Sequence, residues 1–130
     1  MSRKLVFCAA LAAAVVGGPG FAQQPEPLKR TVVQKIDYPG DKTSTLLVLI
    51  EVAPNFLVVK HTHPGIETGY VLEGELELAV DGEPAKKLKP GETYLTPAAA
   101  PHTAKGGAQG AKVIATFVVE KDKPLATVVP

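Results

Sequence analysis

The chain has 130 residues, which is enough for one compact domain. Its 14 Lys and Arg nearly balance its 13 Asp and Glu, so the charge does not favour binding to nucleic acid or to an anionic membrane. One cysteine excludes a disulfide within the chain and a zinc site made of several thiolates. The absence of tryptophan predicts a core that is mostly aliphatic.

Residues 1–22 have the pattern of a secretory signal peptide. A basic start at residues 3–4 precedes an apolar run over residues 5–16, and Gly20-Phe21-Ala22 supplies the small residues that a signal peptidase accepts. We predict cleavage after Ala22, a periplasmic or secreted protein, and no membrane association after cleavage. The alternative is an uncleaved anchor, although the apolar run is shorter than the roughly 20 residues that span a bilayer. Cleavage also removes Cys8.

Residues 23–30 are polar and contain prolines, which predicts a flexible lead-in before a single domain over residues 31–130. Runs rich in apolar and β-branched residues predict strands over 31–37, 43–52 and 56–63. Tyr38-Pro39-Gly40-Asp41 predicts a turn between the first two. In the third strand, simple alternation places Leu57, Val59, His61 and His63 on one face, opposite Val58 and Lys60.

The second half of the domain continues this pattern of short strands and turns. Strands are predicted over 67–73 and 75–80, separated by Gly74, with Leu76 and Leu78 inward and the intervening glutamates exposed. Asp81-Gly82 predicts a hairpin to a short strand over 85–89, and another short strand follows over 93–96. A stiff loop, His102 and a glycine-rich connection over 106–110 lead to a strand over 112–120.

Residues 125–129 predict either a last edge strand or a segment that packs on a second subunit. Residues 23–130 lack a convincing helical period, and many short strands between turns indicate an all-β sandwich or barrel.

The segment His61-Thr62-His63 and the nearby Glu67 are the strongest candidates for a functional site. Residues two apart in a strand point to the same side, so His61 and His63 can converge on one ion. The fold must then place His102, the third and last histidine, beside His61 and His63. Three imidazoles and one carboxylate suit one divalent transition metal ion (Fe, Mn, Co, Ni, Cu or Zn) better than Ca or Mg. Such a set also leaves coordination positions open for a substrate.

Other roles remain open for the polar residues near these histidines. Glu67 is predicted to be a metal ligand and a catalytic residue; the alternatives are a carboxylate that orients an imidazole, or a movable base. Tyr70 and Tyr94 either line the site and donate a hydrogen bond to a substrate, or belong to the core with the hydroxyl at its rim. Lys60 is predicted to be a solvated surface residue.

The two histidine segments resemble the two motifs of the cupin superfamily. The stretch His61-x-His63-x3-Glu67-x6-Gly74 is similar to the first motif, with Asn55 where that motif usually begins with glycine. The stretch Gly91-x5-Pro97-x4-His102 is similar to the second, with Ala99 and Gly106 in place of the usual glycine and asparagine. The resemblance is to small single-domain cupins of type 2. It implies a double-stranded β-helix, or jelly-roll barrel, whose interior is lined by His61, His63, Glu67 and His102.

Two classes of function follow from these expectations. The first is a metal-dependent oxidoreductase or dioxygenase that acts on a small oxygenated organic substrate, with Glu67 assisting deprotonation. The resemblance also allows an isomerase, a decarboxylase or a hydrolase. The second is a non-catalytic module that binds a small ligand or the metal itself. A symmetric homodimer is also predicted, because a sheet edge and the apolar segment 125–129 require cover.

Overall fold

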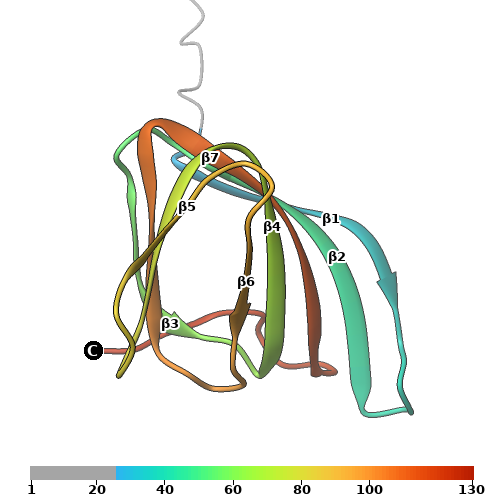
Figure 1. The fold of residues 1–130 in the computed structure, drawn as a ribbon. Coiled ribbons are helices and arrows are strands. Elements are labelled where there is room, and N and C mark those ends of the chain that lie inside the picture. The colour runs from blue at the N-terminus through green and yellow to red at the C-terminus, as the bar shows by residue number, and fades with distance from the viewer. Residues whose placement is uncertain (1–25) are drawn as a thin grey trace, which may run out of the picture.

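Residues 26–130, the part that this computed structural model describes, form β-strands connected by turns and loops (Figure 1). The eight strands are β1 (Leu28–Ile36), β2 (Thr43–Val52), β3 (Leu57–Thr62), β4 (Gly65–Val80), β5 (Lys86–Leu88), β6 (Thr93–Thr96), β7 (His102–Glu120) and β8 (Thr127–Val128). Residues 26–130 contain no helix that is long and apolar enough to cross a membrane. The predicted signal peptide lies outside the described residues.

The two longest strands, β4 and β7, hold the barrel together. They pair with each other in antiparallel fashion over nearly their whole length, from Gly65 opposite Val119 to Val80 opposite His102. At one end they are flanked by β2 and β6, with β1 beyond β2; at the other end they are flanked by β3 and β5, with β8 beyond β3. Both strands therefore run through two sheets that enclose one interior. This is the double-stranded β-helix that the cupin resemblance implies.

Glycines let β4 and β7 bend where they pass from one sheet to the other. Gly74 and Gly110 have φ values of 73° and 77°, in the left-handed region that favours glycine. A Cβ on Gly74 would also lie 2.1 Å from the carbonyl oxygen of Gly110. The sequence analysis divided both strands at these glycines and assigned 106–110 to a connection. In the structure, these residues are corners within continuous strands.

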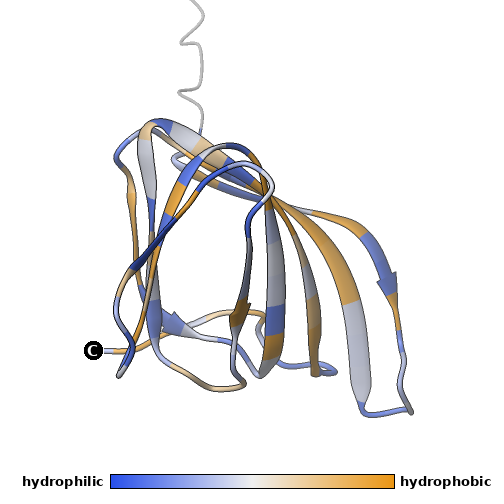
Figure 2. Cartoon of the chain, in the orientation of Figure 1, coloured by the Kyte–Doolittle hydropathy of each residue, from blue (hydrophilic) through white to orange (hydrophobic). Residues whose placement is uncertain are grey.

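The core inside the barrel is aliphatic apart from Phe117, as the composition predicts. Its buried residues are Val48, Ile50, Val52, Val58, Val71, Leu76, Leu78, Val80, Leu88, Ala111, Val113, Ala115, Phe117 and Val119. Leu76 and Leu78 are 3% and 4% exposed, which confirms that they point inward. Figure 2 shows hydrophobic stretches along β2, whose residues alternate between buried and half-buried. The two faces of each strand thus separate the core from the outer surface.

The alternation predicted for β3 is wrong in its first half. Leu57 and Val59 are 52% and 56% exposed, whereas Val58 is 5% exposed. The reason is a β-bulge: Val58 pairs with Ala104 and His61 with His102, so two residues of β3 face one residue of β7. The bulge shifts the inward parity by one position and leaves His61 and His63 inside the barrel.

The first strand begins earlier than predicted. Residues 28–30, which the sequence analysis placed in a flexible lead-in, belong to β1 and pair with residues 50–52 of β2. The β1–β2 hairpin then extends beyond the barrel (Figure 1). At the other end of the chain, β8 pairs with β3, so the predicted last strand is present. The first strand of the described residues therefore starts with Leu28.

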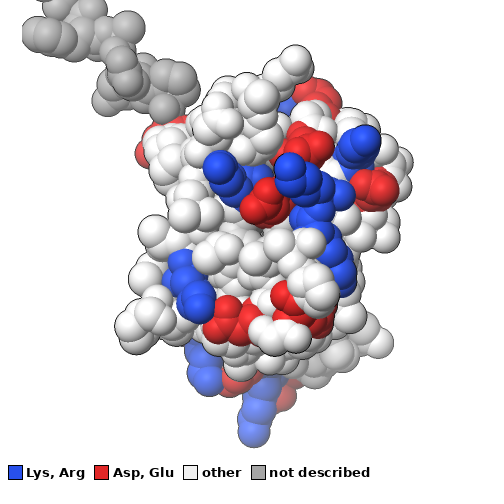
Figure 3. Space-filling view, turned by 60° about the vertical axis from the view of Figure 1, so that its left-hand side comes forward, with Lys and Arg blue, Asp and Glu red and all other residues white. Residues whose placement is uncertain are grey.

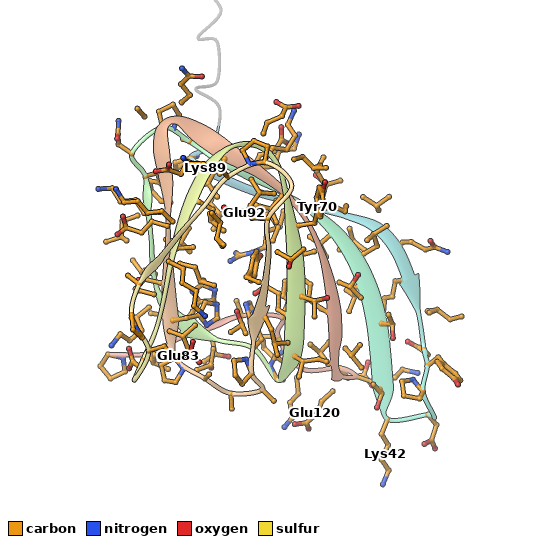
Figure 4. The ribbon with its side chains drawn as sticks, viewed as in Figure 1. Lys42, Tyr70, Glu83, Lys89, Glu92 and Glu120 are labelled. Carbon is orange, nitrogen blue, oxygen red and sulfur yellow. The ribbon has the colours of Figure 1, made fainter. Side chains whose placement is uncertain are left out.

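The outer surface carries charges of both signs close to one another (Figure 3). Lys60 pairs with Asp81, and Lys112 with Glu73, which places Lys60 on the surface as predicted. Lys42, at the tip of the β1–β2 hairpin, and Glu120, at the end of β7, point away from the barrel (Figure 4). The visible surface is thus a mixture of charges without a large patch of one sign.

Candidate metal centre

The fold brings the three histidines together inside the barrel. His61 of β3 lies opposite His102, the first residue of β7, and His63 follows the end of β3. The three side chains are at most 4% exposed, and one potential ligand atom from each lies within 4.8 Å of the other two. The expected return of His102 to the other two histidines is therefore confirmed.

Backbone carbonyl groups fix the orientation of all three imidazole rings. The acceptors of the Nδ1 atoms are Val59 O at 2.8 Å for His61, Leu125 O at 2.6 Å for His63 and Ala100 O at 2.9 Å for His102. A carbonyl oxygen only accepts hydrogen bonds, so each Nδ1 carries a proton, and in the neutral form of the ring Nε2 is the nitrogen left free to bind a metal ion. The rings are thus oriented as metal ligands require.

Burial keeps two of these rings neutral. It lowers the pKa of His61 to about 4, and it also lowers the pKa of His102 below its ordinary value. Metal ions bind neutral imidazole, because a proton on Nε2 would occupy the lone pair that the metal needs. Near neutral pH, protons therefore do not compete strongly for these two nitrogens.

Glu67 of β4 lies beside His63 and His102 and is 4% exposed. Its Oε2 is 3.1 Å from His63 Nε2 and 3.9 Å from His102 Nε2. Burial alone would raise the pKa of Glu67, but hydrogen bonds from His63 and Tyr94 bring the net pKa below its ordinary value. The carboxyl group is therefore an anion within the histidine cluster.

The contact between His63 and Glu67 bears on which group the cluster could bind. Because His63 Nδ1 already donates to Leu125, the 3.1 Å contact joins two acceptors unless a proton or a cation lies between them. The three candidate ligand atoms lie within 4.8 Å of one another, so the histidines would close in around a transition metal ion, which binds imidazole nitrogen at about 2.1 Å. The residues thus fit one divalent transition metal ion of the kinds named above.

Tyr94 reaches the site, whereas Tyr70 does not. Tyr94 of β6 lies opposite Gly69 of β4, and a Cβ on Gly69 would lie 2.2 Å from the tyrosine ring. The missing side chain lets the ring lie across the strand, and Tyr94 Oη donates to Glu67 Oε1 at 2.7 Å. Burial, followed by the charge of Glu67, raises the Tyr94 pKa well above its ordinary value, so the hydroxyl stays protonated. Tyr70 is 45% exposed on the other face of β4 (Figure 4).

Arg30 also belongs to the surroundings of the site, and the sequence analysis missed it. It lies opposite Ile50 in the β1–β2 pair, and its charge contributes to lowering the pKa values of His61 and His102. Residues 23–30 were assigned to a lead-in because of their composition. The alternation of Leu28, Arg30 and Val32 with polar residues was a usable signal that the strand begins earlier.

The two departures from the cupin motifs at turn positions preserve the backbone geometry. Asn55 and Ala99, which stand where glycine is usual, have φ values of 58° and 57°. The Ala99 N–H donates to the carbonyl oxygen of His63 at 3.1 Å, so this turn supports the segment that carries the ligand. The chain thus keeps a left-handed conformation without the glycine that normally supplies it.

Solved structures with a similar fold differ from this chain in sequence. KdgF from Halomonas sp. is 24% identical with a TM-score of 0.61, covering 77% of this chain and 86% of that one. An RmlC-like cupin from Shewanella frigidimarina is 25% identical with a TM-score of 0.58, covering 74% and 79%. The DMSP lyase DddQ from Ruegeria pomeroyi is 19% identical with a TM-score of 0.60, covering 65% of this chain and only 43% of the lyase.

No curated protein matches the chain in sequence. The cupin domain family matches residues 48–119, which include the three histidines, Glu67 and most of the barrel. The interior site, the double-stranded β-helix and this match agree: the chain belongs to the cupin domain family.

Proposed function

We propose that this protein is a metal-dependent enzyme, an oxidoreductase or dioxygenase, that acts on a small oxygenated organic compound inside the barrel. The observation that carries the proposal is the 3.1 Å contact between Glu67 Oε2 and His63 Nε2. It brings a buried carboxylate against the ring nitrogen of a histidine whose Nδ1 already donates to Leu125, and a divalent cation bound between the carboxylate and Nε2 would join the two groups.

His61, His63 and His102 would hold the metal, with Glu67 as the fourth ligand. When bound, the metal supplies a Lewis acid with open positions for a substrate oxygen or dioxygen. Glu67 would also have a catalytic role, because its Oε2, the oxygen that Tyr94 does not hold, would accept a proton from the substrate. Tyr94 holds Oε1 at 2.7 Å and keeps the carboxylate aimed at the centre of the cluster.

A second candidate is a lyase or decarboxylase that does not use dioxygen. The pair formed by Tyr94 and Glu67 favours this alternative, because a protonated phenol bonded to a carboxylate can transfer a proton without any redox change. The fold similarity to the lyase DddQ is consistent with it. A module that binds a small ligand without turning it over is the non-catalytic alternative.

The test is turnover of a panel of small hydroxy, oxo and phenolic compounds, with and without dioxygen. Oxygen uptake that disappears in the His102→Ala variant supports the oxidoreductase, whereas product formation under nitrogen supports the lyase. Ligand-induced stabilisation with no turnover across the panel would replace both with the binding module. Metal content is measured in every sample, so inactivity from metal loss is recognised.

We also propose that the mature protein is exported to the periplasm or outside the cell and forms a homodimer. The outer edge of β1 is unpaired within residues 26–130, and Val33, Ile36 and Tyr38 of the projecting hairpin are 58%, 59% and 64% exposed. These residues make the hairpin a better candidate interface than the C-terminal segment, which pairs with β3 in the same chain. Replacing all three with serine should convert the dimer to a monomer in light scattering, and the mass of the secreted chain tests the cleavage.

A further inference from the structure

Arg30 points into the barrel from β1. In an antiparallel pair, residues directly opposite one another lie on the same face of the sheet. Arg30 is opposite Ile50, a core residue that is 8% exposed, and Leu28 on the same face of β1 packs against the core. The long side chain of Arg30 therefore extends through the interior and not across the outer surface.

One nitrogen of the Arg30 guanidinium group is buried without a hydrogen-bond partner in the described chain. Its Nε is buried without a hydrogen bond, and no ion pair within residues 26–130 includes Arg30. Thr96, which is 1% exposed and lies opposite Glu67, carries the other buried side-chain atom without a partner in this region. Buried polar groups are rarely left unpaired, because desolvating them costs free energy that only a hydrogen bond or an ion returns.

Both groups belong to strands that face the interior in which the candidate metal ligands lie. Thr96 is directly across from Glu67, and the charge of Arg30 acts on Glu67, Tyr94, His61 and His102. Arg30 is nevertheless more than 4 Å from any Glu67 oxygen, since the two form no ion pair. The arginine thus shares the interior with the metal ligands without being neutralised by their carboxylate.

The charges in this interior favour an anionic ligand. A divalent ion and Arg30 together carry three positive charges against the single negative charge of Glu67. A planar guanidinium is also well suited to bind a carboxylate through two parallel hydrogen bonds. A small organic acid would place its carboxylate at Arg30 and a second oxygen at the metal.

We propose that Arg30 binds the carboxylate of the substrate, so that the protein acts on small organic acids with a second oxygen donor. This assignment rests on the proposed function of the metal centre. Arg30 acts as a substrate-binding and specificity-determining residue, and the hydroxyl of Thr96 is available as a further hydrogen-bonding group. The assignment explains why the chain retains an unpaired cation in its interior.

The experiment uses the full mature protein loaded with Co(II), whose visible absorption reports on ligands that enter the metal's coordination. The probes are glycolate, pyruvate and malonate, each compared with an uncharged amide analogue such as glycolamide. In the wild type, at least one acid should change the cobalt spectrum and bind at least about 10-fold more tightly than its amide. If no acid changes the spectrum, or if amides bind as tightly as acids, the assignment is wrong.

Arg30→Met should weaken binding of the acid about 10- to 100-fold while cobalt content and binding of the amide stay unchanged. Arg30→Lys should recover only part of the loss, because lysine keeps the charge but not the two-pronged geometry. Lys29→Met is the matched control: Lys29 is the neighbouring cation in β1, is exposed and pairs with Glu51. Equal loss of acid binding in Lys29→Met would indicate a general charge effect and overturn the assignment.

Two further readouts separate this assignment from the function on which it rests. If Arg30 were only structural, Arg30→Met would unfold at a lower temperature; removal of an unpaired buried charge should instead leave the Tm unchanged or raise it. Absence of cobalt from the wild type would contradict the proposed metal centre. Normal cobalt content with unchanged acid binding in Arg30→Met would contradict the role of Arg30 alone.

Discussion

Lys60 and His61 are neighbours in β3, yet they belong to different regions of the molecule. Lys60 pairs with Asp81 at 3.0 Å on the outside of the barrel, where the two side chains are 38% and 50% exposed. His61 is 4% exposed and is held by a backbone carbonyl. Water can replace either partner of the exposed ion pair, so the pair adds little free energy. The buried ring of His61 has no water to replace its backbone acceptor, so loss of that hydrogen bond would cost free energy. Polar groups inside the barrel are therefore placed for a ligand, and those outside contribute little to stability.

The largest effect is expected from His102→Ala, which removes one inner nitrogen. Loss of an outer hydrogen-bond partner of a metal ligand typically costs 10- to 100-fold in affinity, so loss of the ligand itself should cost more than about 100-fold. Elemental analysis after dialysis measures the result. Lys60→Ala in the same strand pair is the control and should keep its metal. Full metal content in His102→Ala would show that this histidine is not a ligand.

A smaller effect is expected from Tyr94→Phe, which removes the hydroxyl that donates to Glu67. A hydrogen bond to a charged acceptor contributes about 1.5–3 kcal/mol, so the metal-free variant should lose stability of that order. Urea unfolding measures the change. Tyr70→Phe, on the outer face, removes the same atom and should change the free energy of unfolding by less than about 0.5 kcal/mol. Equal losses of unfolding free energy in Tyr94→Phe and Tyr70→Phe would contradict the prediction that the buried hydroxyl contributes more than the exposed one.

A substitution in the turn beside His63 is predicted to raise the free energy of unfolding, unlike the two substitutions above. Ala99 has a φ of 57°, a conformation that costs a residue with a Cβ about 1–2 kcal/mol. Glycine avoids this cost but loses about 0.4–1 kcal/mol through the greater freedom of the unfolded chain. Ala99→Gly should therefore stabilise the protein by up to about 1.6 kcal/mol in urea unfolding. A destabilised variant would mean that the contacts of the Ala99 methyl group contribute more free energy than the relief of backbone strain provides.

The smallest effect is expected outside the barrel, at Asp37. Hydrogen bonds from Lys121 and Ser44 lower the pKa of this carboxyl group below its ordinary value. The pairing therefore adds stability above the carboxyl pKa of the unfolded chain, and this contribution disappears as the pH falls through the lowered pKa of the folded protein. Asp37→Asn should unfold slightly more easily than the wild type at about pH 7, and the difference should shrink as the pH falls below the ordinary Asp pKa of about 3.9. A difference that grows at low pH would contradict this assignment.

Much of the fold and of the site could be predicted because it depends on local chemistry. The strands over 43–52 and 93–96 have the predicted bounds, since turn residues flank runs that alternate or are continuously apolar. His61, His63 and His102 meet as the motif spacing implied. The metal and carboxylate chemistry follows from the kinds of side chain that gather there.

The rest depends on features that a sequence shows poorly. The bulge in β3 exposes Leu57 and Val59, and alternation alone could not reveal it, because the extra residue is defined by the pairing with β7. Gly106 to Gly110 look like a loop, but Gly106 pairs with Leu76 and Ala111 with Gly74, so the residues between them form an irregularity within β7 that the pairing with β4 defines. Arg30 was hidden because its strand depends on pairing with β2 more than on its own composition.

The hydrogen bond from His63 to Leu125 determines when the site can be completed. Its two residues are 62 positions apart, and the acceptor is near the C-terminal end of the sequence. A growing polypeptide that has reached only β7 contains all three histidines, but His63 still lacks the group that orients its ring. The orientation of the His63 ring therefore depends on the segment that follows β7 and folds back against the end of β3.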